Sequence, residues 1–373
     1  MTKKSDAPAI RFKGFSDAWE QRKAKELFVS TADKGYPELP VLSATQDRGM
    51  IRRDENSINI FHDKKNEAGY KRVLPGQFVI HLRSFQGGFA HSAIEGITSP
   101  AYTVFGFSEP EKHDSEYWKY VFTSKSFIQR LETVTYGIRD GRSISYEEFL
   151  TLGFVYPSKA EQTAIARYLD KLSDLITLHQ RKCVFLFGLF QASISMIFTA
   201  STFSWEQRKA KEICSIGTGK SNTQDQVDDG KYPFYVRSDV PVRSNKYLYD
   251  CEAVITIGDG NIGKVFHYVN GKFDLHQRCY KITDFKDIWG KYFFYYFSTK
   301  FYDRAMKMTA KATVDSVRLE MISEMDIIKP PQISEQKQIA EFFANLDNLI
   351  TLHQRELEKL QNIKKSMLEK MFV

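Results

Sequence analysis

The chain has 373 residues, a formal net charge of +7, and 29 Phe and 19 Tyr among its side chains. This length allows two or three domains with sizeable hydrophobic cores, and the aromatic content excludes a chain that is disordered throughout. The mild excess of positive charge favours an acidic partner such as nucleic acid.

The cysteines and the amino-terminal residues indicate the compartment. The cysteines are widely spaced and form no CxxC pair: Cys183, Cys214, Cys251 and Cys279. This spacing indicates neither a zinc site nor a redox motif, and it fits a reducing compartment. Residues 1–8 are polar and contain no apolar segment typical of a secretory signal. We therefore expect a cytoplasmic protein.

The first part of the chain predicts a mixed α/β module. Residues 15–27 are expected to form a helix. Residues 77–82 and 101–107 alternate like β-strands, and residues 114–133 repeat apolar side chains at helical spacing. The glycine-containing sequence YGIRDGRS at residues 136–143 is expected to form a loop.

A long helix is predicted after Pro157. Ser158 and Glu161 have the spacing of a capping box, in which the serine caps the helix and the glutamate reaches back to the first amide. The apolar stretch at residues 183–198 lies within this helix. It is shorter than the roughly 20 residues needed to span a bilayer, and Gln191 interrupts it. We therefore expect a helix buried in protein and no membrane association.

Two short sequence motifs each occur twice along the chain, which indicates a tandem duplication. Residues 18–26 read AWEQRKAKE and residues 204–212 read SWEQRKAKE, whereas residues 175–181 and 349–355 both read LITLHQR. The duplication predicts a recognition module, a central spacer helix, a second module and a C-terminal spacer helix. Their expected bounds are 15–157, 158–202, 203–331 and 332–373.

The two long helices are predicted to pair with each other. Each has about 35 residues and would be roughly 50 Å long at 1.5 Å per residue. Their apolar positions follow a pattern close to the heptad repeat of coiled coils. The predicted fold class is therefore α+β, with two tandem mixed α/β modules joined by an antiparallel, coiled-coil-like stalk of pseudo-two-fold symmetry.

The outer faces of the two long helices differ. When the LITLHQR copies are aligned, Val184 and Phe185 of the first helix correspond to Glu358 and Lys359 of the second. A helix that is apolar all round is usually buried all round. Either the first helix packs against more protein than its sister, or its sequence has drifted and enlarged the local core. The sequence favours neither explanation.

Two glycine-rich sequences resemble nucleotide-binding motifs but lack their context. GTGKS, at residues 217–221, has Cys214 where a phosphate-binding loop requires its first glycine, and a helix is expected before it instead of a strand. Gly258, Gly260 and Gly263 have the GxGxxG spacing, but a strand is expected next instead of a helix. A nucleotide site is therefore disfavoured at both.

No catalytic signature stands out. The chain contains no Asn/Asp-Pro-Pro-aromatic box of a DNA methyltransferase, no clear acid–acid–lysine nuclease cluster and no HExxH metal site. We therefore predict no catalytic residue, no metal ligand and no cofactor bound by this chain.

Polar and basic side chains interleaved with aromatics remain on predicted loops of both modules. Arginine usually pairs with guanine and Asn or Gln with adenine, whereas Lys and Ser usually contact phosphates. An ordinary solvated role is the alternative for any one of these side chains. The DNA-contact candidates in the first module are Lys71, Arg72, Arg83, Ser84, Phe85, Gln86, Arg139, Arg142 and Ser143. Those in the second are Arg237, Arg243, Asn245, Lys246, Asp259, Asn261, Lys264, Gln277, Arg278, Lys311, Thr313 and Arg318.

Several motifs together are typical of one family. They are the repeated WEQRKAKE and LITLHQR phrases, EQ-x-x-IA helix starts at residues 161–166 and 335–340, and strand-and-glycine segments at residues 82–88 and 258–266. With them the chain resembles the specificity subunits of type I restriction–modification systems. That resemblance implies two target-recognition domains, each reading one half of a bipartite DNA site, and helices that set the gap.

The resemblance also implies partners. Two modification subunits would dock on the helices and transfer a methyl group from S-adenosylmethionine to adenine in double-stranded DNA. Two restriction subunits, where present, would add ATP and Mg. This chain would itself be non-catalytic. The docking candidates are Phe185, Phe190, His179 and His353.

Two other classes of function stay open. One is a standalone enzyme that holds a nucleotide at a glycine-rich sequence. The other is a structural adaptor without any preference for a DNA sequence.

Overall fold

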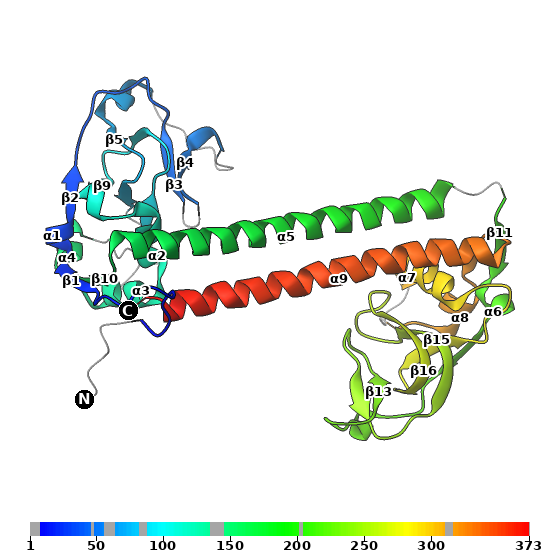
Figure 1. Cartoon of the computed structure of the whole chain (residues 1–373). Helices are drawn as coiled ribbons and strands as arrows, with labels where there is room; N and C mark the ends of the chain where they lie inside the picture. The colour runs from blue at the N-terminus through cyan, green and yellow to red at the C-terminus, as the bar shows by residue number, and fades with distance from the viewer. Residues whose placement is uncertain are drawn as a thin grey trace. The chain divides into compact units, whose positions relative to one another are not determined.

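The computed structural model describes residues 8–45, 48–55, 64–81, 88–134, 145–200, 204–309 and 316–372. They divide into two compact units, of which unit 1 lies within residues 1–179 and 356–373 and unit 2 within residues 180–355. Each unit combines one sheet-containing module with part of two long helices, α5 (Lys159–Ala200) and α9 (Ile333–Lys370) (Figure 1). The predicted class of two mixed α/β modules with two long helices is confirmed.

Unit 1 is built on short strands. Its four-stranded antiparallel sheet has the order β2-β9-β6-β7, and β1-β10, β3-β4 and β5-β8 form two-stranded sheets. Before α5, its strands and helices are β1 (Glu20–Lys23), α1 (Ala24–Leu27), β2 (Phe28–Thr31), β3 (Leu42–Thr45), β4 (Gly49–Arg52), β5 (Lys71–Val73), β6 (Phe78–Ile80), β7 (Phe89–His91), β8 (Gly96–Thr98), β9 (Thr103–Phe107), α2 (Ser115–Thr123), α3 (Lys125–Val134), α4 (Tyr146–Leu150) and β10 (Gly153–Tyr156). Three 3-10 turns cover Arg53–Glu55, Lys64–Gly69 and Pro110–Lys112.

Aromatic side chains form the core of unit 1. Phe28, Phe78 and Phe105 on the sheet pack against Trp118 and Phe122 on α2, and all five are buried. The rings of Phe78 and Phe122 meet edge to face, with centroids 4.9 Å apart. Burial of such a ring contributes roughly 2–3 kcal/mol, so this cluster holds α2 on the sheet. The helix predicted at residues 114–133 is present as α2 and α3.

The helix predicted at residues 15–27 is wrong for most of its length. Glu20–Lys23 is strand β1, which pairs antiparallel with β10, and only Ala24–Leu27 is helical. The apolar spacing that suggested a longer helix comes from Trp19, Ala24 and Leu27, which are buried. Pairing with the strand that closes the module outweighs the local helical pattern.

The repeated phrase has the same role in unit 2. Strand β11 (Glu206–Lys209) pairs antiparallel with β18 (Asp326–Lys329), the strand that precedes α9. The following alanine is fully buried in both copies, as Ala24 and Ala210. The WEQRKAKE phrase therefore joins the opening of each module to its closing strand, which makes it part of the frame.

Unit 2 contains a six-stranded sheet of order β12-β17-β15-β16-β13-β14, antiparallel except for the β13–β16 pair. Helix α7 (Gly290–Thr309) packs on this sheet, where the buried Phe297 contacts Phe266 of β16. Besides β11, β18 and α9, its elements are α6 (Ala210–Ile213), β12 (Ser215–Thr218), a 3-10 turn at Thr223–Asp225, β13 (Tyr232–Tyr235), β14 (Val242–Ser244), β15 (Tyr249–Ile257), β16 (Phe266–Leu275), β17 (Cys279–Thr283), α7 (Gly290–Thr309) and α8 (Leu319–Ser323).

A buried glutamine fastens the start of each long helix to its module. Gln162 accepts hydrogen bonds from the Asp114 amide and the Trp118 indole, and donates to the Pro157 carbonyl at 2.8 Å. Gln336 accepts from the Trp289 amide and donates to the carbonyl of Pro330, also at 2.8 Å. The EQ-x-x-IA motif thus acts through packing and hydrogen bonds at a helix start.

The two long helices run antiparallel within each unit, as predicted. In unit 1 the Ile10 amide, next to Arg11, donates to the Lys370 carbonyl, and Arg11 binds Glu161 at the other helix start. Further along, Lys364 donates to Ser173. In unit 2, Phe198 stacks on Phe343 and Trp205 donates to Glu335. The predicted capping role of Glu161 is replaced by its two hydrogen bonds from Arg11, at 2.7 and 2.9 Å.

Candidate nucleic-acid interface

Three loops of unit 2 bring two arginines to one carboxylate. Arg237 follows β13, Asp259 lies between β15 and β16, and Arg278 lies between β16 and β17. The Asp259 carboxylate accepts from Arg237 Nη1 at 3.1 Å and from Arg278 Nη1 at 2.9 Å. We call these three residues the Arg–Asp–Arg cluster. The sequence named all three as candidates, and the sheet brings them together.

Glycines fix the backbone of this cluster. The Gly258 amide donates to the Arg278 carbonyl at 2.8 Å, and the Val317 amide donates to the Gly258 carbonyl at 2.7 Å. A side chain at position 258 would lie 2.6 Å from the Arg278 carbonyl oxygen, so only glycine fits there. Gly260 and Gly263 have φ of +83° and +66°. The GxGxxG spacing therefore serves a turn between two antiparallel strands, and no helix follows it.

The electrostatics keep the cluster ionised and open to solvent. Burial raises the pKa of Asp259, but hydrogen bonds from Arg278 and Arg237 outweigh burial, so this pKa lies below its usual value. The side chains of Arg237 and Arg278 are 47% and 60% exposed. A cavity of about 200 Å³ beside Asp259 is also lined by Gln277, Arg278 and Tyr280. Directed donors at an exposed rim suit the recognition of a polar ligand edge.

Ser221 and Asp274, which the sequence did not suggest as site residues, support this site together with His276. Ser221 Oγ donates to the buried Asp274 carboxylate at 2.6 Å, and the Ser221 carbonyl accepts from the Gln277 amide. The Arg278 amide donates to His276 Nδ1 at 3.1 Å. Burial and the two nearby arginines lower the pKa of His276. Ser221 ends the GTGKS sequence and pairs with His276 on the loop that carries Arg278, so this sequence does not form a phosphate-binding loop.

The remaining candidates of unit 2 have mixed surroundings. Asn261 and Gln277 are exposed next to the cluster, and Lys264 lies 5.7 Å from the centre of the Tyr302 ring. Arg243 donates to backbone carbonyls of the preceding loop, and Lys246 binds Asp225 at 2.8 Å. These two contacts fasten the unit's own loops. The other candidates are exposed Asn245, exposed Arg318 at the start of α8, and Lys311 and Thr313, which lie outside the described residues.

The unit 1 candidates are described only in part. Lys71 donates to the Tyr102 carbonyl at 2.6 Å, and burial, with Lys34 nearby, lowers its pKa. Arg72 binds Glu95 and lies 4.5 Å from the centre of the Tyr36 ring. Both side chains therefore help to hold the module together. Seven candidates lie outside the described residues: Arg83, Ser84, Phe85, Gln86, Arg139, Arg142 and Ser143.

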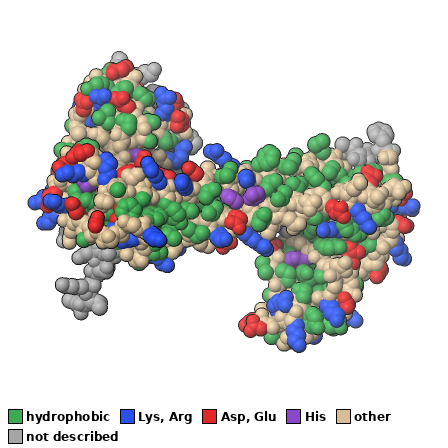
Figure 2. All heavy atoms as spheres, viewed as in Figure 1, with side chains coloured by type: hydrophobic (Ala, Val, Ile, Leu, Met, Phe, Trp, Pro, Cys, Tyr) green, Lys and Arg blue, Asp and Glu red, His purple; other side chains and the backbone are tan. Residues whose placement is uncertain are grey.

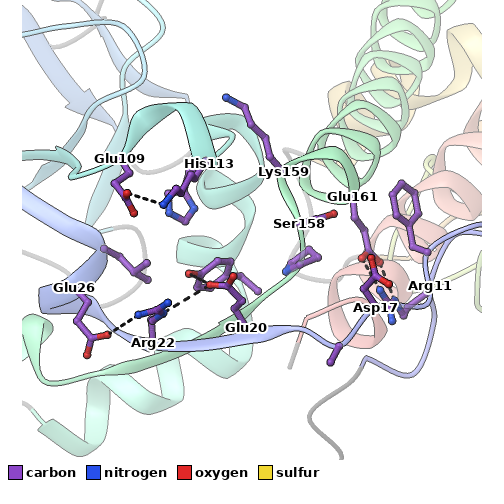
Figure 3. Close-up of a pocket in the computed structure, with 16 residues that line it drawn as sticks. Arg11, Asp17, Glu20, Arg22, Glu26, Glu109, His113, Ser158, Lys159 and Glu161 are labelled. Carbon is purple, nitrogen blue, oxygen red and sulfur yellow. Dashed lines mark hydrogen bonds and ion pairs between the residues drawn. The ribbon is translucent and has the colours of Figure 1, made fainter.

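A charged pocket in unit 1, next to the first WEQRKAKE sequence, is unsuited to phosphate (Figure 3). Its volume is about 510 Å³, and its lining includes four basic and five acidic side chains. Arg22 lies 3.7 Å from both Glu20 and Glu26, and Arg11 binds Glu161 at 2.7 Å. These charges neutralise one another, so the pocket has a structural role where the start of the module meets the start of α5.

Comparison with known proteins identifies the second half of the chain. Residues 204–362 match the family model of the type I restriction modification DNA specificity domain. These residues are a type I restriction–modification DNA specificity domain. The resemblance that the sequence motifs predicted is therefore confirmed, and the Arg–Asp–Arg cluster lies within this specificity domain.

Two curated specificity subunits are similar to the chain in sequence, and one solved structure is similar to it in fold. The chain is 27% identical over 162 residues to the EcoDI specificity subunit of Escherichia coli, covering 43% of this chain and 34% of that protein. It is 27% identical over 181 residues to the MjaVIII specificity subunit of Methanocaldococcus jannaschii, covering 45% and 42%. The chain thus spans less than half the length of either relative. The crystal structure of a type I S subunit from M. genitalium has the same fold, with a TM-score of 0.70 over 98% of this chain and 99% of that chain at 15% identity.

The long helices expose apolar side chains in both units. In the LITLHQR copies, Leu175 and Leu178 are 43% and 46% exposed in unit 1, and Leu349 and Leu352 are 44% and 53% exposed in unit 2. The neighbouring candidates His179 and His353 are half-buried, and each has an interaction partner. The two units therefore present the same apolar feature once each.

Helix α5 exposes a second apolar surface in unit 2. Val184, Phe185, Phe187 and Met196 are 75%, 68%, 57% and 70% exposed, and Figure 2 shows hydrophobic side chains along this part of the helix. This face is therefore not buried within the chain, and an enlarged local core, one of the two explanations that the sequence left open, does not account for it. Among the described residues one helix, α5, is long and apolar enough to cross a membrane, which by itself is weak support for a span.

Proposed function

We propose that this chain is the DNA-reading subunit of a type I restriction–modification complex. The observation that carries the proposal is the exposed Arg–Asp–Arg cluster within a DNA specificity domain. Guanidinium groups are the side chains most often used to read bases in the major groove, and a rigid backbone reduces the entropy lost on binding. The module in each unit contacts one half of a bipartite site in double-stranded DNA.

The two half-sites have different sequences. The segments that open and close each module are alike in the two units, but the sheets between them are different. The WEQRKAKE strand and the buried glutamine have the same contacts in both units. Between them, unit 1 carries a four-stranded main sheet and unit 2 a six-stranded one. Different inserts in a common frame support recognition of two different sequences, and hence an asymmetric site.

The helices hold the partners that perform the chemistry. The exposed leucines of the LITLHQR copies give each unit the same apolar surface, which suits two copies of one protein. We assign these surfaces to two modification subunits, which bind S-adenosylmethionine, flip the target adenine and methylate it. Restriction subunits using ATP and Mg join where they are present. The chain itself positions these subunits on the DNA and performs no catalysis. It acts in the cytoplasm.

Exchange of one module tests this division of labour. Residues 29–157 are replaced by the corresponding module of another specificity subunit, and the chain is co-expressed with its modification subunit in cells that lack adenine methylation. Long-read sequencing should then show a methylated motif in which one half changes and the other half and the gap stay the same.

The reciprocal exchange is the control. Replacement of residues 213–331 should change only the other half of the motif. If either exchange altered both halves, or neither, the assignment of one module to one half-site would be refuted.

A further inference from the structure

Arg278 is held through only one of its three side-chain nitrogens. Its Nη1 donates to Asp259 at 2.9 Å, and the side chain is 60% exposed. Within the described part of the chain, Nε and Nη2 have no protein acceptor. These two nitrogens form one edge of the planar guanidinium group and donate two parallel hydrogen bonds. The edge that makes bidentate contacts is therefore available to a ligand.

The position of this edge is fixed before any ligand arrives. The Arg278 amide donates to His276, its carbonyl accepts from Gly258, and its guanidinium group binds Asp259. Asp259 is in turn held by Arg237 through both carboxylate oxygens, at 3.1 and 3.2 Å. A side chain restrained at its backbone and at its tip loses little rotamer entropy on binding.

The charge balance favours a base over a phosphate as the ligand. One carboxylate offsets one of the two arginine charges, so the cluster of Arg237, Asp259 and Arg278 has a net charge of about +1. Partial neutralisation weakens the long-range attraction to phosphate, which depends on net charge. It leaves the directional hydrogen bonds of the free guanidinium edge intact.

We infer that Arg278 reads a guanine in the half-site contacted by unit 2, with Asp259 as the positioning residue that orients it. The inference rests on the proposed function and names the base and the side chain that reads it. In the major groove guanine offers two acceptors side by side, O6 and N7, and these match the Nε–Nη2 edge. Adenine replaces one acceptor with an amino donor, which faces a guanidinium donor unfavourably.

Motif mapping tests the inference in cells. The full chain is co-expressed with its modification subunit, and methylated adenines are mapped for the wild type and for Arg278→Ala, Arg278→Lys and Asp259→Asn. Loss of one bidentate contact reduces discrimination at one base pair roughly tenfold to a hundredfold. Both Arg278 variants should therefore relax one guanine position in one half-site, and Asp259→Asn should relax the same position more weakly.

The matched control is Arg208→Ala. Arg208 is a similarly exposed arginine of unit 2, at 56%, with a nearby glutamate 3.9 Å away. It lies on β11 in the frame of the module, so its loss should leave the motif unchanged. Arg278→Lys keeps the positive charge, which separates base reading from a phosphate contact.

A modified duplex tests the contact directly with the purified complex. Replacing the assigned guanine with 7-deazaguanine removes N7 and retains O6. The wild-type complex should bind this duplex roughly tenfold more weakly, whereas the Arg278→Ala complex should bind both duplexes equally. An unchanged motif in both Arg278 variants, a half-site without guanine, or equal wild-type binding to the two duplexes would overturn the inference. A wild-type chain that directs no sequence-specific methylation would overturn the proposed function itself.

Discussion

The duplicated sequence produces an equivalent contact between α5, α9 and the module in each unit, which we call the helix crossing. This crossing is polar in unit 1 and aromatic in unit 2. In unit 1, Lys364 donates to Ser173 at 2.8 Å and lies 5.7 Å from the centre of the Tyr120 ring. The Tyr120 hydroxyl donates to Asp170 at 2.7 Å, and Lys119 binds the same carboxylate at 2.9 Å. Hydrogen bonds and charge therefore join the helices to the module in this unit.

In unit 2 the equivalent of Lys364 is Phe190. Its ring packs against Phe343 and Tyr295, with centroids 5.4 and 6.4 Å apart. The Tyr295 hydroxyl donates to Asp347 at 2.8 Å, so this aromatic contact also contains a hydrogen bond. The two units thus have an equivalent helix contact, which is made by a lysine in unit 1 and by a phenylalanine in unit 2.

The solvent-facing sides of α5 and α9 also differ, and packing within the chain does not explain the difference. Val184 and Phe185 of α5 are exposed in unit 2, whereas the equivalent residues of α9, Glu358 and Lys359, lie in unit 1 and are charged. The contact with α9 and α7 already buries Phe198 and half-buries Phe190, and no further internal contact explains the exposed pair. The comparison teaches that one copy of the helix has a charged, solvated face and the other an apolar face suited to a partner.

The largest expected effect comes from making the two outward faces alike. The combined change Val184→Lys, Phe185→Lys and Phe187→Lys removes three apolar side chains that are more than half exposed, so the fold of the chain should be unaffected. If a modification subunit covers this face, its affinity should fall at least a hundredfold, which corresponds to roughly 3 kcal/mol. The measurement is co-purification of the complex followed by titration of the purified components.

The control for this change is on the sister helix. Glu358→Ala with Lys359→Ala alters the equivalent, charged positions and should leave assembly unchanged. Normal assembly by the triple variant, together with improved solubility, would remove this face from the docking surface.

A change at the crossing itself should affect stability in one unit more than in the other. Phe190→Ala removes a half-buried ring from the aromatic contact with Phe343 and should cost about 2 kcal/mol, less than a fully buried phenylalanine because part of the ring is exposed. Lys364→Ala in unit 1 removes a lysine whose pKa is lowered by burial and by Lys119, and it should cost roughly 0.5 kcal/mol.

Denaturant unfolding of the two variants measures the difference. Equal losses would show that the crossings are energetically equivalent in spite of their chemistry. This contact also means that the predicted docking role of Phe190 is better tested at Phe185, since substitution of Phe190 disturbs unit 2 directly.

The repeats made the frame predictable from the sequence. Pro157 and the EQ-x-x-IA motif located the start of α5 to within a residue or two, and the strands at residues 77–82 and 101–107 contain β6 and β9. The error at residues 15–27 has a physical cause. Strand β1 is exposed along its whole length, so it has no apolar alternation, and its partner β10 lies more than a hundred residues away.

The site was predictable as residue types and not as an arrangement. Arg237, Asp259 and Arg278 were recognisable as polar side chains on loops, but their meeting depends on the order of strands in the sheet. Ser221 and Asp274 were not proposed as site residues, because the hydrogen bond between their side chains joins positions 53 residues apart and has no sequence signature. The exposure of Phe185 was likewise invisible, because an apolar pattern does not say whether the covering protein is the same chain.

The smallest expected effect concerns Asp347, the carboxylate that accepts a hydrogen bond from Tyr295 in unit 2. Burial raises the pKa of Asp347, against the opposing influence of Tyr295 and Lys291. A carboxyl whose pKa is higher in the folded than in the unfolded state stabilises the fold below the unfolded pKa, and this contribution is lost as pH rises through the folded pKa. Asp347→Asn keeps an acceptor for Tyr295 and removes the charge, so at pH 7 it should raise stability by roughly 0.5 kcal/mol.

The equivalent test in unit 1 should have the opposite sign. Asp170 binds Lys119 at 2.9 Å, so Asp170→Asn loses an ion pair and should lower stability at pH 7 by about 1 kcal/mol. Denaturant midpoints measured at pH 7 and near pH 3.5 separate the two cases, because the gain in Asp347→Asn should disappear in acid, where the wild-type carboxyl is protonated. Losses of equal sign in both variants would mean that the aromatic crossing needs its carboxylate charge as much as the polar crossing does, and the contrast between the two units would then be one of side-chain shape alone.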